Sequence, residues 1–99
     1  MKKPKYQLGS LVCAYIKDAR NVIHDDIKAK YSSIITGQIT EIKIGRRDNE
    51  VEFIYRVFLE NDFVYIPEND IFSTNATISV DETTNEIVVQ DKTRTERYK

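Results

Sequence analysis

The chain has 99 residues, of which 40% are hydrophobic and 31% are charged. This length allows one domain with a single modest core, and the composition excludes an intrinsically disordered chain. Lys and Arg total 15 against 16 for Asp and Glu, so the net charge is −1. This balance argues against a dedicated binder of the nucleic-acid backbone, because such proteins normally present a basic face. Six Tyr, four Phe and many β-branched residues favour a β-rich fold.

The chain begins with a short basic lead-in, residues 1–7, in which Pro4 disfavours a helix. This lead-in lacks the apolar core of a signal peptide, and no apolar run of the sequence is long enough to span a membrane. The single cysteine, Cys13, permits no disulfide within the chain and no cysteine-based zinc site. We therefore expect a cytoplasmic protein without a membrane partner.

The first strand is predicted to begin at Tyr6 or Leu8 and to end at Lys17. Apolar residues occupy both of its faces, which alternate as Val12, Ala14 and Ile16 against Leu11, Cys13 and Tyr15. We expect such a strand to be buried on both sides, or to form a barrel wall that another segment covers. Gly9 predicts a bend or bulge at its start. Cys13 is then expected to be a buried structural thiol rather than a nucleophile.

Residues 18–33 are the longest connection between predicted strands, and long connections often carry binding sites. Ile23, Ile27 and Tyr31 recur at helical spacing, but the same stretch also fits two short strands that turn at Asp25-Asp26, and both interpretations stay open. The only imidazole, His24, lies beside these carboxylates. No recognisable spacing completes a set of metal ligands around it, so we expect a solvated histidine and no metal site.

Residues 35–72 carry the strongest strand pattern of the chain. Isoleucines change sides within the first part of this region, because Ile35 and Ile39 share one parity whereas Ile42 and Ile44 share the other. This change predicts a bulge near Thr40-Glu41, and Gly37 permits a close approach of another backbone. A solvated turn over residues 45–50 should lead into the next strand.

The strand over residues 51–60 is apolar on both faces. Tyr55 and Val57 are predicted core residues, and Ile54 and Phe58 lie on the opposite face. A small barrel cannot bury both faces of one strand, so we expect the insert 18–33, the C-terminal hairpin or a second chain to cover Ile54 and Phe58.

Two turns follow this strand. Asn61-Asp62 should form a tight hairpin turn, because both residues tolerate positive φ. Residues 67–70 should leave the sheet as one 3₁₀ turn before Ile71 and Phe72 return to the core. Residues 74–91 then predict a separate β-hairpin, which is marginal alone and must pair or pack elsewhere. Residues 92–99 are polar and expected to be flexible.

The pattern resembles a small SH3-like barrel of the Tudor/KOW type, of the kind encoded by phages and mobile elements. The matching residues are Leu8-Gly9 followed by Val12, the spaced Gly37, Ile39 and Ile42, the pair Tyr55 and Val57, and the run Pro67-Glu68-Asn69-Asp70-Ile71. The resemblance implies a five-stranded barrel over residues 8–73, with an insert at 18–33 and an added C-terminal β-hairpin. It carries over no catalytic residue and no cofactor. The insert, the Asn61-Asp62 turn and the C-terminal hairpin depart from the usual pattern.

These features favour a non-catalytic protein-interaction module that serves as an accessory or host-directed factor of a phage or mobile element. A homodimer is one of the assemblies that would cover its second apolar face. The candidate partner-binding residues are Tyr31, Ile54, Phe58, Tyr65, Glu68, Asp70 and Phe72. A nucleic-acid-binding barrel is the first alternative and would need a basic groove built from Lys28, Lys30, Arg46 and Arg47. An oligomeric binder of a small molecule or nucleotide is the second alternative. Nucleic acid is the less favoured partner, because Asp48 and Glu50 follow the paired arginines directly.

Overall fold

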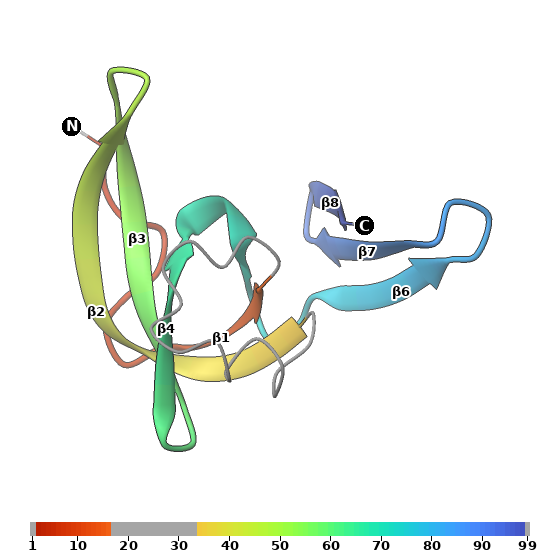
Figure 1. Ribbon diagram of the computed structural model, residues 1–99, viewed down its shortest axis with the longest axis horizontal. Coiled ribbons are helices and arrows are strands. Elements are labelled where there is room, and N and C mark those ends of the chain that lie inside the picture. Colours follow the sequence, from red (N-terminus) through yellow and green to blue (C-terminus); the bar gives the residue numbers. More distant parts are fainter. Residues whose placement is uncertain (1, 17–33, 99) are drawn as a thin grey trace.

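The computed structural model describes residues 2–16 and 34–98, which form two antiparallel sheets (Figure 1). The elements are β1 (Leu11–Tyr15), β2 (Ile34–Arg47), β3 (Glu50–Leu59), β4 (Asp62–Pro67), the 3₁₀ turn η1 (Glu68–Asp70), β5 (Ile71–Phe72), β6 (Thr77–Asp81), β7 (Glu86–Asp91) and β8 (Arg94–Tyr98). The first sheet has the strand order β4-β3-β2-β1-β5, and the second has the order β6-β7-β8. The predicted all-β class is confirmed, but β4 and β5 are the two edges of an open sheet rather than neighbours in a closed barrel.

The first core lies on the inner face of the five-stranded sheet. Its buried residues are Val12, Ala14, Ile16, Ile35, Ile39, Phe53, Tyr55, Val57, Leu59, Val64, Ile66 and Ile71. Tyr55 and Val57 are completely buried, which confirms the alternation predicted for the third strand. The expectations for residues 18–33, including His24 and Tyr31, lie outside the described residues.

A bulge in β2 adjusts the faces of this long strand. The register of β2 against β3 shifts between Ile39 and Glu41, which confirms the bulge predicted from the change of parity. Ile39 before the bulge and Ile42 after it therefore both contact the first core. Gly37 permits the predicted close approach, because a Cβ atom at this position would lie 2.5 Å from the carbonyl oxygen of Phe58.

A second core lies between the outer face of β1 and β5 and the C-terminal sheet. Tyr15, Phe72 and Val89 are its buried members. The ring of Tyr98 stacks on Tyr15 with the ring centroids 3.7 Å apart, and it meets Phe72 edge-on. Strand β1 thus sends alternate residues into both cores. The expectation of a strand buried on two sides, with a buried Cys13 thiol, holds only in part, because Cys13 is half-buried and Leu11 is exposed.

Two turns differ from their predicted positions. Strand β2 continues to Arg47 and β3 starts at Glu50, so only Asp48 and Asn49 form the first turn, both with positive φ. The next turn comprises Glu60 and Asn61 rather than Asn61 and Asp62, because Asp62 already pairs with Leu59. The observed and predicted registers differ by two residues, which keeps every side chain on the same face. The apolar pattern therefore did not distinguish them.

The C-terminal part is more ordered than its composition suggested. The predicted hairpin is present as β6 and β7, and the predicted 3₁₀ turn is present as η1. Residues 94–98, expected to be flexible, instead form β8, which pairs with β7 along its whole length. Polar side chains stabilise this strand: Arg94 donates hydrogen bonds to the carbonyl oxygens of Asn69 and Ile71 and lies over the ring of Phe72.

Candidate functional site

Three of the predicted partner-binding residues lie together on the outer face of the first sheet. Phe58 is 44% exposed, and Ile54 and Tyr65 are half-buried on the same face of β3 and β4. The other predicted residues do not join them. Tyr31 is outside the described residues, and Glu68, Asp70 and Phe72 make internal contacts at other places.

A row of four paired residues, apolar except for Gln38, crosses four strands at this face. Phe58 pairs with Phe63 of β4 on one side and with Gln38 of β2 on the other, and Gln38 pairs in turn with Leu11 of β1. Leu11 is 64% exposed. The second sheet covers the outer face at Tyr15 but leaves this row open to solvent. We call the following residues the outer aromatic face: Leu11, Ile54, Phe58, Phe63 and Tyr65.

Charged side chains lie within and beside the outer aromatic face and contact its rings. The Arg56 guanidinium lies 5.2 Å from the ring centre of Phe63, and the Lys43 ammonium lies 4.4 Å from that of Tyr65. Arg56 also donates a hydrogen bond of 2.9 Å to the hydroxyl of Thr40. Glu41 lies within 4.0 Å of both cations. Arg56 lies between Ile54 and Phe58 on the same face of β3, so aromatic rings and charges are mixed on this surface. Aromatic residues and arginine are the residue types enriched at protein–protein interfaces.

Glu68 is a buried structural acceptor and not a partner-binding residue. Its carboxylate accepts a hydrogen bond of 2.6 Å from the hydroxyl of Tyr55 and one of 3.1 Å from the backbone N–H of Lys5. A buried carboxylate needs such donors because its desolvation is costly. Glu68 was predicted to bind a partner, but its carboxylate is buried and accepts its hydrogen bonds from donors of the same chain.

Asp70 and Phe72 join the two sheets. Asp70 accepts a hydrogen bond of 3.0 Å from the hydroxyl of Tyr98, and Phe72 is completely buried against the same ring. A side chain with no exposed surface cannot line a groove for a partner, so the assignment of Phe72 to the binding surface is wrong. Asp70 through its hydrogen bond and Phe72 through its ring contact thus both hold Tyr98 of the C-terminal sheet in place.

Buried tyrosines make the protein sensitive to alkaline conditions. Burial, with the hydrogen bond to Glu68 next, raises the pKa of Tyr55 far above its ordinary value, and burial followed by the charge of Asp70 does the same for the pKa of Tyr98. Burial also raises the pKa values of Tyr6 and Tyr15. Folding therefore favours the neutral phenols.

We expect the free energy of unfolding to fall steeply above about pH 10, where tyrosines of the unfolded chain lose protons that the folded protein retains. Below that pH the phenols are protonated in both the folded and the unfolded state, so they do not make the free energy of unfolding depend on pH. Urea midpoints measured between about pH 8 and pH 11 test this. Tyr55→Phe should flatten the decline. An unchanged wild-type midpoint over the whole range would show that the phenols are not buried as described.

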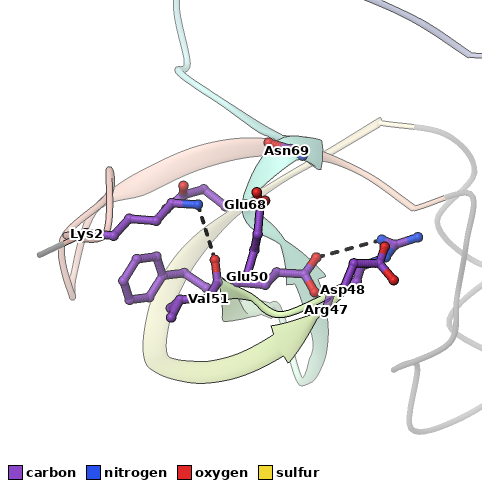
Figure 2. A pocket seen from close by; sticks show the side chains of 9 residues that line it. Lys2, Arg47, Asp48, Glu50, Val51, Glu68 and Asn69 are labelled. Atoms are coloured by element: carbon purple, nitrogen blue, oxygen red, sulfur yellow. Dashed lines mark hydrogen bonds and ion pairs between the residues drawn. The ribbon is translucent and has the colours of Figure 1, made fainter.

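A hollow of about 360 Å³ lies beside the β2–β3 turn and η1 (Figure 2). It is lined by Lys2, Arg47, Asp48, Glu50, Val51, Glu52, Phe53, Glu68 and Asn69. Lys2 donates to the carbonyl oxygen of Val51, and Arg47 lies 3.9 Å from Glu52. Several of its charged groups thus already have partners within the chain, and the mixed charges select no ligand of one sign.

Cys13 and the possible metal ligands were the sequence features with chemical potential. Cys13 is half-buried, and its sulfur lies 3.6 Å from the hydroxyl of Thr36, which is not a general base at neutral pH. Within residues 2–16 and 34–98, no group of three or more His, Cys, Asp or Glu side chains is placed to hold a metal ion. The same part of the chain contains no helix long and apolar enough to cross a membrane.

The sequence analysis identified Phe58 and Tyr65 as members of this surface, but it did not identify Leu11 and Arg56. Leu11 was expected only as part of a strand apolar on both faces, and Arg56 was not singled out. Both depend on the register of β2 between β1 and β3, which brings Leu11 and Phe58 to opposite sides of Gln38. No sequence spacing reports that register.

No protein-family model matches the chain, and no curated protein or solved structure is significantly similar to it. The geometry of the outer aromatic face is therefore the strongest guide to function. It is a partly exposed row of residues, apolar except for Gln38, and the charged side chains of Lys43, Arg56 and Glu41 lie among and beside its rings.

Proposed function

We propose that this chain is a non-catalytic protein-interaction module whose first sheet is of the SH3-like type. The strand order β4-β3-β2-β1-β5, the bulge in β2 and the 3₁₀ turn before β5 support this assignment of the sheet. The resemblance to barrels of phages and mobile elements, and the single cysteine, favour a cytoplasmic accessory or host-directed factor. Fold alone does not define a function, so we base the proposed protein binding on the outer aromatic face.

The observation that carries this function is the exposure of Phe58 on the outer aromatic face. Aromatic residues and arginines dominate the energetics of many protein interfaces, and Phe58 and Arg56 are neighbours on the same face of β3. Phe58 is held on both sides by paired strands, so its binding costs little backbone entropy. The charged side chains among and beside the rings carry both signs of charge, which suits a protein surface better than a polyanion.

Nucleic-acid binding is the weaker alternative. Arg46 and Arg47 lie at the exposed end of β2, but Arg47 is 3.9 Å from Glu52, and the chain as a whole carries a charge of −1. A strong phosphate contact normally requires several unpaired cations on one face. We therefore propose a protein rather than a nucleic acid as the partner.

Affinity capture from a lysate of the native host tests the proposal with three baits. The wild type should retain a specific protein at near-stoichiometric amount, Phe58→Ser should lose it, and Ile44→Ser should retain it. Ile44 is 71% exposed and pairs with Phe53, so it lies on the opposite face of the sheet and is a matched exposed control. Urea denaturation should give similar midpoints for the three baits, because both substitutions are at exposed side chains.

Nuclease treatment of the lysate separates the two classes of partner. Retention of the protein should be unchanged after nuclease, because it depends on contact with Phe58. Loss of all retained material after nuclease would favour the nucleic-acid alternative. Identical retention by all three baits would contradict the assignment of the outer aromatic face as the binding surface.

A further inference from the structure

The edge strands of the two sheets differ in how well they are protected. An edge strand carries unpaired N–H and C=O groups, and proteins commonly protect it with proline, charged residues or short length. Strand β4 ends at Pro67, β5 has two residues, and β8 carries charges at Arg94, Glu96 and Arg97. Among the described strands, β6 pairs with β7 on one side only, has five residues and contains no proline. Its single charged residue, Asp81, already accepts a hydrogen bond from Arg97.

The apolar face of the second sheet continues onto this unprotected strand. Ile78 pairs with Val89, which is completely buried in the second core, and Val80 pairs with Ile87, which also contacts that core. Paired residues of an antiparallel sheet share one face. Ile78 and Val80 are nevertheless 44% and 61% exposed. Figure 1 shows the reason, since the β6–β7 hairpin extends away from the first sheet towards its turn.

We propose that β6 pairs with β6 of a second copy of this chain, antiparallel and centred on Ser79, to give a two-fold dimer with one continuous six-stranded sheet. In this register Ile78 meets Val80 of the second copy and Thr77 meets its Asp81. Apolar residues therefore meet apolar residues on one face, and no like charges meet on the other. A register shifted by one residue would put the apolar side chains on opposite faces.

A second copy is the occupant that fits this strand best. A two-fold axis brings the same patch of both subunits together, so the patch must be complementary to itself. The register centred on Ser79 is the one that pairs all five residues of β6 with residues of β6. This dimer leaves the outer aromatic face free on each subunit, because that face belongs to the other sheet. The inference therefore stands independently of the proposed function.

Disulfide trapping in a Cys13→Ser background tests the register. Ser79→Cys should give a covalent dimer on mild oxidation, because opposite residues of an antiparallel pair have Cα atoms about 4.5–5.5 Å apart, within the range that a disulfide bridges. Thr77→Cys is the matched control on the same strand and face. Its two copies would lie roughly 13 Å apart in this register, so it should stay monomeric in denaturing electrophoresis. Equal cross-linking of both variants, or of neither, would overturn the proposed pairing.

Sedimentation equilibrium of the variants without new cysteines tests the dimer itself. At micromolar concentration the wild type should have the mass of two chains, Val80→Lys should have the mass of one, and Thr95→Lys should remain a dimer. Thr95 is an exposed residue on β8, the opposite edge of the same sheet. A monomeric wild type contradicts the proposal. So does a dimer that Phe58→Asp dissociates and Val80→Lys does not, since that result would place the contact on the outer aromatic face.

Discussion

Replacing Gly37 with alanine should lower the free energy of unfolding by about 2–3 kcal/mol, the cost of forcing extra volume into a well-packed site. The new Cβ atom would lie 2.5 Å from the carbonyl oxygen of Phe58 and 2.6 Å from a methyl group of Val57. The carbonyl belongs to a paired strand, and Val57 is completely buried, so neither neighbour can move freely. Urea denaturation of the wild type and Gly37→Ala measures the difference.

A second glycine of the same strand provides the control. A Cβ atom at Gly45 would meet its nearest neighbour, the Ile54 side chain, at 3.6 Å, which is an ordinary contact. Gly45→Ala should therefore be neutral or stabilise the protein by up to about 1 kcal/mol, because glycine costs conformational entropy in a strand. Equal midpoints for the two variants would mean that β2 and β3 do not cross as closely as described.

Replacing Tyr98 with alanine should cost about 2–3 kcal/mol, less than the loss of a fully buried aromatic residue, because the side chain is half-buried. The substitution removes the stack on Tyr15 and the edge contact with Phe72, and it removes the hydrogen bond to Asp70. The substitution thus exposes part of the second core where β8 packs against it. Thermal or urea denaturation of the purified variant measures the loss.

Tyr98→Phe separates the ring from its hydroxyl. This variant keeps the stack on Tyr15 and should lose only about 1 kcal/mol, the usual net contribution of one hydrogen bond. A wild-type midpoint for Tyr98→Ala would support the expectation from composition, namely that residues 92–99 are flexible, and would contradict the placement of β8.

The sequence predicted the features of this fold that depend on alternation along one strand. The bulge beside Thr40, the burial of Tyr55 and Val57 and the burial of Tyr15 on the second face of β1 all follow from where apolar side chains change sides. The tight approach at Gly37 was predictable for a related reason, since a residue without a side chain in an apolar strand indicates close backbone contact.

Features that depend on register or on long polar side chains were missed. The turn at Glu60-Asn61 was displaced by one residue because two registers two residues apart bury the same faces. Strand β8 was assigned to a flexible tail because its arginines were counted as solvated. Arg94 instead lies over the ring of Phe72 and donates hydrogen bonds to two backbone carbonyl groups. Its side chain therefore covers part of the second core.

The same limits apply to the candidate site. Ile54 and Phe58 were predicted because they lie opposite the core face of their strand, and Tyr65 was predicted as an aromatic residue of a binding groove. The three residues do lie together. Glu68 and Phe72 were misassigned because their partners, Tyr55 and Tyr98, are distant in sequence. Pairings of that kind arise only when the chain is folded.

Site-specific photo-crosslinking tests the central claim most directly, namely that the outer aromatic face binds a protein partner. A photoreactive phenylalanine analogue introduced at Phe58 should cross-link to one predominant host protein when the chain is expressed in its native host. The same analogue at Ile44, which is exposed on the opposite face, should give no such product. A predominant product from position 44 and none from position 58 would contradict the account.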